Sequence, residues 1–199
     1  MILIGLTGGT GSGKSAVSEV LAEYGGLILD ADKLARRVVE KGEAAYCEIM
    51  EHFGKDIFDE NGDLIRKRLG DIVFNDPAEL EFLNKCTHKY IGELTEKELA
   101  EAEKNPDKYK FAVFDAPQLI ESGMDKMCDK IWVVTADEEV RIKRIMERDS
   151  ITRQQAKSRI DSQLKFEDFE KIADRIIFND GSLEELREQI EKILSDIKD

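Results

Sequence analysis

The sequence predicts an α/β fold of three layers, in which helices cover both faces of a five-stranded parallel sheet. The first observation is a set of short apolar runs that are continuous rather than alternating, as in strands buried on both faces. The second is that stretches of helical periodicity separate these runs. The predicted strands are residues 2–5, 27–29, 111–114, 131–134 and 176–178.

The N-terminal elements follow one another as strand, loop, helix, strand and helix. After the run at 2–5 comes a glycine-rich loop, and apolar residues then recur at helical spacing from 16 to 21. The second strand, 27–29, is closed by residues 30–32, and another helical period begins at 34. This alternation is typical of a parallel sheet with helical crossovers.

The length of 199 residues suits one hydrophobic core, so we expect a single domain over residues 1–199. The long stretch between the second and third strands is rich in helical periodicity and poor in strand signals, which predicts a helical insertion. The expected parts are a core of residues 1–42, 110–136 and 174–199, a helical lobe of residues 43–109, and a lid region of residues 137–173. Within the core, residues 183–197 keep one apolar stripe, which predicts an amphipathic C-terminal helix on the sheet.

Composition narrows the class of protein. Hydrophobic residues make up 41% of the chain and charged residues 37%, which is typical of a soluble folded protein. The apolar stretch at 1–6 is far shorter than the roughly 18 residues of a membrane span. The three cysteines have no C-x-x-C spacing, and the net charge of −13 opposes binding along a nucleic-acid backbone. We therefore expect a cytoplasmic protein that binds neither nucleic acid nor membrane; its oligomeric state stays open.

A phosphate-binding loop is the most specific motif in the chain. The pattern G-x-x-x-x-G-K-[ST] is matched by Gly8, Gly9, Thr10, Gly11, Ser12, Gly13, Lys14 and Ser15. A predicted strand precedes the motif and a predicted helix follows it, so backbone N–H groups and the helix N-terminus would face the phosphates of a nucleotide. The alternative is a plain glycine turn with a surface lysine. We predict that residues 9–16, including Ala16, bind ATP, that Lys14 reaches the β- and γ-phosphates, and that Ser15 ligates Mg²⁺.

Other motifs separate the classes of protein that use such a loop. A GTPase would carry a guanine-reading N-K-x-D, but Asn84 and Lys85 are followed by Cys86 and Thr87 in a helical stretch. A motor protein or large ATPase would need a longer chain. The sequence therefore favours a three-layer P-loop kinase fold with a helical insertion and an arginine-rich lid.

The lid is basic although the chain as a whole is acidic. Residues 141–165 hold eight Lys and Arg against three Asp and Glu. Because phosphoryl transfer depends on positioning and charge stabilisation, we predict that Arg144 contacts the transferring phosphate. Arg148 lies one helical turn further on the same face and is predicted to bind ATP.

The alternative for these basic residues is a solvated helix face with ion pairs at i, i+4. This interpretation is favoured for three of them, with Glu138, Glu139 and Glu147 as the partners. The three residues are Arg141, Lys143 and Lys157.

Several motifs together resemble the dephospho-CoA kinase family along almost the whole chain. They are residues 5–9, Asp30-Ala31-Asp32, Asp115-Ala116-Pro117 with Leu119 and Glu121, Arg148-Asp149, Arg159-Ile160 with Gln163, and Ala173-Asp174 with Asn179 and Gly181. The resemblance implies that the helical insertion binds the acceptor, that the arginine-rich segment closes as a lid, and that the ribose 3′-hydroxyl of dephospho-CoA attacks the γ-phosphorus of ATP. Coenzyme A and ADP would be the products. Lys89 after His88, and Gln118, depart from the residues usual in the family.

Two aspartates at strand ends are candidate site residues. Asp32 follows the second strand at the edge where open α/β sheets place ligands, and we predict that it accepts the proton of the acceptor hydroxyl. The alternative is an N-cap, although Asp30 suits that role too. Asp115 ends the third strand, where it would hold Mg²⁺ through water or touch the acceptor; the alternative is a capping aspartate before Pro117.

The remaining candidates rest on the resemblance. It implies that Asn179 borders the adenine of ATP, although a turn after the last strand would also explain this residue. It also implies that Thr7, Pro117 and His88 contact the acceptor, while a structural role for His88 is the alternative. The competing functions are another small-molecule or nucleoside monophosphate kinase, and a nucleotide-binding regulatory module without catalysis.

Overall fold

The computed structural model describes residues 1–196 and divides into two compact units. Residues 1–28 and 105–199 form the first unit, and residues 29–104 form the second. The Ile197 end of the predicted C-terminal helix lies outside the described residues.

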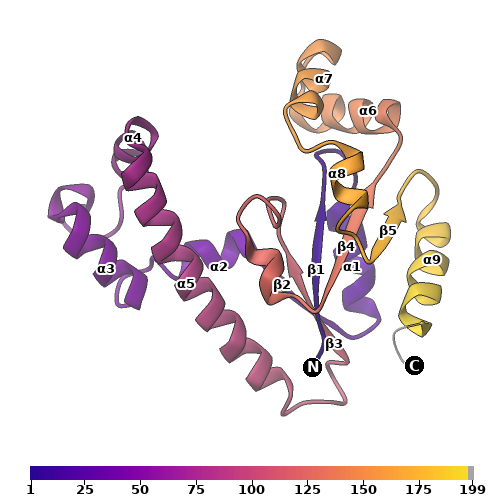
Figure 1. Ribbon diagram of the computed structural model, residues 1–199, viewed down its shortest axis with the longest axis horizontal. Helices are drawn as coiled ribbons and strands as arrows, with labels where there is room; N and C mark the ends of the chain where they lie inside the picture. The colour runs from indigo at the N-terminus through magenta and orange to yellow at the C-terminus, as the bar shows by residue number, and fades with distance from the viewer. Residues whose placement is uncertain (197–199) are drawn as a thin grey trace. The chain divides into compact units, whose positions relative to one another are not determined.

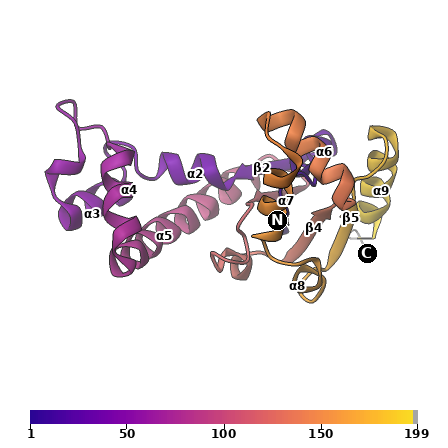
Figure 2. The same cartoon turned by 90° about the horizontal axis from the view of Figure 1, so that it is seen from above.

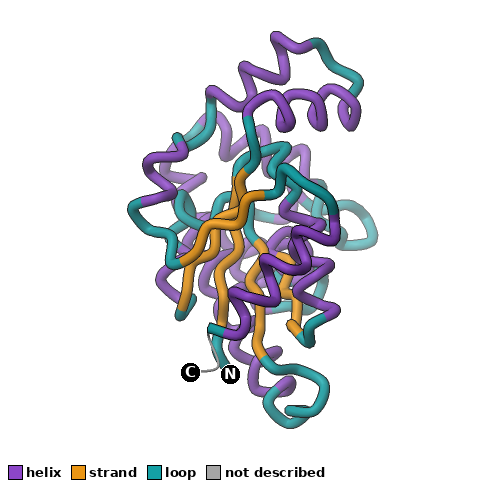
Figure 3. The backbone as a smooth tube through the Cα atoms, turned by 90° about the vertical axis from the view of Figure 1, so that its right-hand side faces the viewer, coloured by secondary structure: helices purple, strands orange, loops and turns teal. Residues whose placement is uncertain are grey.

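A parallel sheet of five strands organises the first unit (Figure 1). The strands are β1 (Leu3–Gly8), β2 (Gly26–Asp30), β3 (Phe111–Asp115), β4 (Lys130–Thr135) and β5 (Arg175–Phe178). Their order is β2-β3-β1-β4-β5, and they are visible as neighbouring orange segments in Figure 3. All five predicted strands are confirmed. The central strand β1 is buried along its whole length, which explains its continuous apolar sequence.

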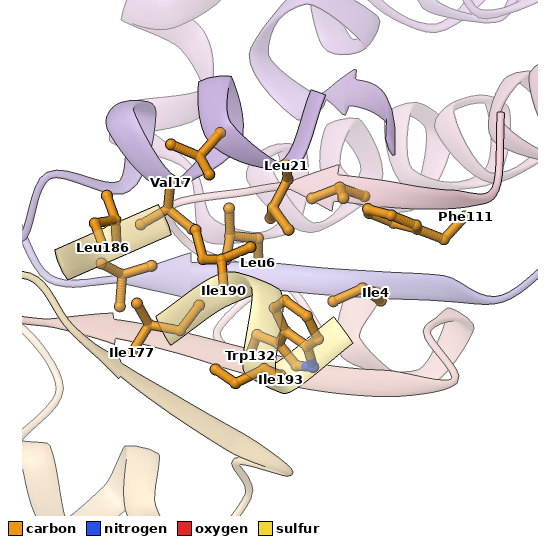
Figure 4. Packing of buried hydrophobic residues seen from close by; sticks show 13 residues of the cluster. Ile4, Leu6, Val17, Leu21, Phe111, Trp132, Ile177, Leu186, Ile190 and Ile193 are labelled. Carbon is orange, nitrogen blue, oxygen red and sulfur yellow. The ribbon is translucent and has the colours of Figure 1, made fainter. Parts of the chain in front are cut away.

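Two helices cover one face of this sheet. They are α1 (Lys14–Glu23) and α9 (Leu183–Ser195), whose apolar stripes meet strands β1, β3, β4 and β5 in one core (Figure 4). Ser182 caps α9 through a reciprocal pair of hydrogen bonds with Glu185. The described part of α9 therefore confirms the amphipathic helix that the sequence predicts.

The other face of the sheet is packed tightly against the turns that follow β3. Leu119 in these turns is fully buried. A Cβ atom added to Gly5 would lie 2.7 Å from Leu119 Cδ2 and 2.8 Å from Cys128 Sγ. Only glycine allows this close approach between β1 and the segment that covers it. The turns lead into the 3₁₀ helix η2 (Met124–Met127).

Truncation of Ile190 tests the core under α9. This side chain is fully buried in the cluster shown in Figure 4, so Ile190→Ala is expected to lower the free energy of unfolding by about 2–5 kcal/mol. Trp132 is the only tryptophan and lies in the same cluster, so its fluorescence during urea unfolding reports this core. Glu191→Ala, at an exposed position of the same helix, is the control. Equal effects of both variants would contradict the packing.

The predicted lid region is helical. It contains α6 (Glu138–Asp149), α7 (Arg153–Asp161) and α8 (Phe166–Glu170). Helices α6 and α7 pack on each other, as Figure 2 shows, around a small cluster of Ile142, Ile145 and Ala156. Thr152 and Gln155 form a capping box that starts α7.

The second unit is a set of packed helices, as the sequence predicts for most of it. Its elements are α2 (Ala31–Arg37), α3 (Ala44–Phe53), the 3₁₀ helix η1 (Lys55–Ile57), α4 (Arg66–Asn75) and α5 (Pro77–Ala102). The 26-residue helix α5 packs against α2, α3 and α4. No helix within residues 1–196 combines the length and the apolar character needed to cross a bilayer.

Candidate active site

The phosphate loop has the backbone geometry that its glycines permit. It leaves the end of β1, and α1 begins at Lys14, so the predicted order of strand, loop and helix is confirmed. Gly11 has a φ of 78° and Gly13 has a φ of 82°. Residues with a Cβ atom rarely adopt this backbone conformation. The loop closes on itself through the Ser12 N–H, which donates to the Gly9 carbonyl at 3.1 Å.

The loop also leaves a polar atom without a partner. The side chain of Ser12 is buried, and among the described residues its hydroxyl has no hydrogen-bond partner. A buried hydroxyl is nearly always paired in a native protein, by protein, water or ligand. Together with the glycine backbone, this orphaned hydroxyl fits a site built for the oxygens of a polyphosphate.

Lys14, the first residue of α1, contacts Asp115, the last residue of β3. The Lys14 ammonium donates to Asp115 Oδ1 in an ion pair, and Ser18 Oγ donates to Asp115 Oδ2 at 2.5 Å. Turns rather than a helix follow Asp115, so the alternative of a helix cap is wrong for this residue. Ser18 was not predicted, although it lies one helical turn beyond Lys14 and therefore on the same face of α1.

Arg144 and Asn179 close on the loop from two other elements. Arg144, on α6, places Nη1 at 3.3 Å from the Ser12 carbonyl oxygen and donates from Nη2 to the Asn179 carbonyl at 2.9 Å. The Asn179 side chain donates from Nδ2 to the Ser12 carbonyl at 2.9 Å. Asn179 is buried directly after β5, and its side-chain amide stabilises the loop through this hydrogen bond to Ser12.

Other basic residues of the predicted lid region are exposed or paired with carboxylates. Arg148 is exposed and pairs with Asp149 through two hydrogen bonds of 2.7 and 2.9 Å, which raise the pKa of its guanidinium. Lys157 pairs with Glu138 at 2.9 Å, and Lys143 is exposed, as the solvated interpretation predicts.

For Arg141 the solvated interpretation is wrong. Its side chain is half-buried, Nε donates to the Thr10 carbonyl at 3.0 Å, and burial lowers the pKa of the guanidinium. Gln163 joins this contact, because its side-chain oxygen accepts from the Thr10 N–H at 2.7 Å. The sequence placed Gln163 in a family motif without giving it a role.

Two predicted acceptor residues meet at the end of β1. Thr7 is fully buried and its hydroxyl donates to the Pro117 carbonyl at 3.2 Å. The structure thus brings Thr7 and Pro117 together beside the phosphate loop, although they are 110 residues apart in the chain.

The second unit carries Asp32 and His88. Asp30 is the N-cap of α2, where its side chain accepts from the Lys33 N–H at 3.0 Å. Asp32 is exposed in the first turn of the same helix, so the capping role belongs to Asp30 and the alternative for Asp32 is wrong. His88 is half-buried on α5, and this burial lowers the pKa of its imidazole.

The sheet order, the phosphate loop and the arginines that close on it define a P-loop kinase. A family model described as dephospho-CoA kinase matches residues 2–185. The chain belongs to the dephospho-CoA kinase family.

Individual relatives agree with this assignment. The chain is 41% identical to a dephospho-CoA kinase of Corynebacterium glutamicum over 99% of this chain and 100% of the relative. It is 46% identical to that of Fusobacterium nucleatum over 99% of each. The solved dephospho-CoA kinase of Campylobacter jejuni has a TM-score of 0.69 and 30% identity, covering 98% of this chain and 96% of that one. A shikimate kinase of Acinetobacter baumannii, at 16% identity and a TM-score of 0.55, shares the fold.

Proposed function

We propose that this protein transfers the γ-phosphoryl group of ATP to the ribose 3′-hydroxyl of dephospho-CoA, giving coenzyme A and ADP in the last step of coenzyme A synthesis. The observation that carries this proposal is the full-length similarity to curated dephospho-CoA kinases, combined with an intact phosphate loop. In the reaction a bond forms between O3′ and the γ-phosphorus, and the bond from that phosphorus to the β,γ-bridging oxygen breaks.

The phosphate donor would be held by the first unit. Residues 9–16 present the loop N–H groups and the start of α1, which suit the α- and β-phosphates of ATP. Lys14 would exchange its partner Asp115 for phosphate oxygens, and Arg144 would offset the charge on the transferring group. Arg148 and Asn179 complete the proposed ATP site.

Ser15 and Asp115 are the residues that would hold Mg²⁺. Ser15 is exposed in the first turn of α1, and both residues offer oxygen atoms, the ligands that this cation prefers. Within the described part of the chain, no cluster of three or more His, Cys, Asp or Glu could hold a metal. Mg²⁺ in phosphoryl-transfer sites is usually held by one or two protein oxygens and by substrate phosphates, and here it would neutralise phosphate charge.

Four residues are proposed to act on dephospho-CoA, one as the base and three as contacts. Asp32 is the proposed base, because its exposed carboxylate is not needed as the cap of α2. Thr7, Pro117 and His88 are proposed acceptor contacts; burial lowers the pKa of the His88 imidazole, which favours its neutral form. We place the protein in the cytoplasm as one kinase domain with small-molecule substrates, where residues 43–109 bind the acceptor and 137–173 form the lid.

A coupled ADP-release assay tests the proposed function. With Mg-ATP, we expect saturable turnover with dephospho-CoA and formation of coenzyme A by mass, but none with AMP, CMP or adenosine. Turnover with another acceptor would favour a different small-molecule kinase. ATP binding without turnover of any acceptor would favour a regulatory module.

A further inference from the structure

Gln163 occupies a donor of the phosphate loop. It follows the end of α7, and its side-chain oxygen lies 2.7 Å from the Thr10 nitrogen. The N–H groups of such a loop are the donors that bind phosphate oxygens in P-loop proteins. A neutral amide oxygen therefore lies where an anionic phosphate oxygen would accept the same hydrogen bond.

Arg141 completes this arrangement above Gly9. Its Nη2 lies 3.4 Å from Gln163 Oε1, while its Nε donates to the Thr10 carbonyl at 3.0 Å. A Cβ on Gly9 would collide with the Arg141 guanidinium and would lie 3.3 Å from Gln163 Oε1. Because Gly9 has no Cβ, the Arg141 and Gln163 side chains can pack directly against the loop backbone.

The charge of Arg141 is not matched by these acceptors. Within residues 1–196, the hydrogen bonds of its guanidinium go to a backbone carbonyl and to a side-chain amide, both neutral. Glu138, on the same helix, is the carboxylate whose charge acts on it most. An arginine held half-buried against a phosphate loop by neutral acceptors keeps its capacity for an anion.

We propose that Gln163 and Arg141 set the affinity of the loop for the phosphate donor: Gln163 accepts from the Thr10 N–H, and an incoming triphosphate replaces it there and pairs with Arg141. The exchange is favourable because a hydrogen bond to an ionised oxygen is about twice as strong as one to a neutral oxygen. Gln163 thus lowers the affinity for ATP, whereas Arg141 raises it. This proposal rests on ATP binding by the loop but not on the identity of the acceptor.

Binding of Mg-ATP and of tripolyphosphate to the full chain, measured by calorimetry without acceptor, tests the proposal. Gln163→Met keeps the size of the side chain but has no amide oxygen, so both ligands are expected to bind about two- to tenfold tighter, the net effect of one hydrogen bond. Gln163→Glu places a carboxylate on the same donor and is expected to weaken both by about tenfold or more. Arg141→Met is expected to weaken both by about tenfold.

Matched controls are available on the same helices. Gln154→Met on α7 and Lys143→Met on α6 change exposed residues and should leave both affinities within about twofold of the original. A Gln163→Met variant that binds Mg-ATP with equal or lower affinity overturns the proposal, since a purely structural glutamine would give that result. Unchanged binding by Arg141→Met also overturns it. Calorimetry shows these outcomes even if the protein uses another acceptor than dephospho-CoA.

Discussion

Lys14→Ala is expected to lower kcat/KM for dephospho-CoA phosphorylation by about 10²- to 10³-fold. The ammonium of Lys14 is held at the start of α1 by Asp115, next to a loop whose backbone fits phosphates. In the proposed reaction it stabilises charge on the γ-phosphoryl oxygens. Alanine removes this cation while the backbone N–H groups of the loop remain.

The control separates loss of chemistry from loss of fold. Lys143→Ala removes an exposed lysine from the same unit and should leave turnover unchanged. Since Lys14→Ala leaves the carboxylate of Asp115 without this ammonium, Lys14→Ala combined with Asp115→Asn removes that charge as well. Urea unfolding followed by Trp132 fluorescence checks each variant. Near-normal turnover of folded Lys14→Ala would show that the loop does not bind the transferred phosphate.

Asp32→Asn is expected to lower kcat by about 10²- to 10⁴-fold with little change in KM for dephospho-CoA. Asparagine keeps the size and the hydrogen-bonding capacity of the side chain, but it cannot take the proton of an attacking hydroxyl. Because Asp32 does not cap α2, its replacement should change the free energy of unfolding by less than about 0.5 kcal/mol. Steady-state kinetics at saturating Mg-ATP measure the effect.

Asp30 provides the contrasting variant two residues away. Asp30→Ala removes the acceptor for the Lys33 N–H and is expected to cost about 0.5–2 kcal/mol of stability. Its kcat should stay close to the original value. If Asp32→Asn lost stability while kcat per folded molecule was unchanged, Asp32 would be a structural residue and not the base.

The sheet and the phosphate loop could be predicted because their signals are local. Each strand is a continuous apolar run, since the sheet is covered on both faces, and the loop combines required glycines with a flanking strand and helix. The helical character of residues 43–109 also follows from local periodicity. The fold class could therefore be predicted with little knowledge of contacts between residues distant in the chain.

Arg141 shows where local reasoning failed. Spacing alone gave Arg141 and Lys157 the same solvated role, but only Lys157 pairs with carboxylates, Glu138 and Asp161. Arg141 lies three residues before Arg144 on α6 and so shares the face that meets the loop. The spacing of Arg141 and Arg144 was visible in the sequence. It assigned Arg141 to the phosphate loop only once the structure showed that this face of α6 contacts the loop.

Gln163 could not have been placed by spacing at all. It is 153 residues from Thr10 in the chain, and only the tertiary fold brings its amide to the loop. Asn179 is a similar case. Its position in a turn after a strand does not indicate that its side-chain amide donates to the Ser12 carbonyl. Such contacts depend on how distant elements pack, which no local pattern encodes.

The central position of β1 has a consequence for the order of events during synthesis on the ribosome. The loop motif at residues 8–15 is translated before β3 and β4, but β1 pairs with both of these strands, which end at Asp115 and Thr135. The support from Asn179 is made later still. A nascent chain therefore carries a nucleotide-binding sequence long before it has the scaffold that shapes it. Contacts of this sequence separation form late and slowly, so the loop becomes competent to bind only after the segments that support it have been translated and packed.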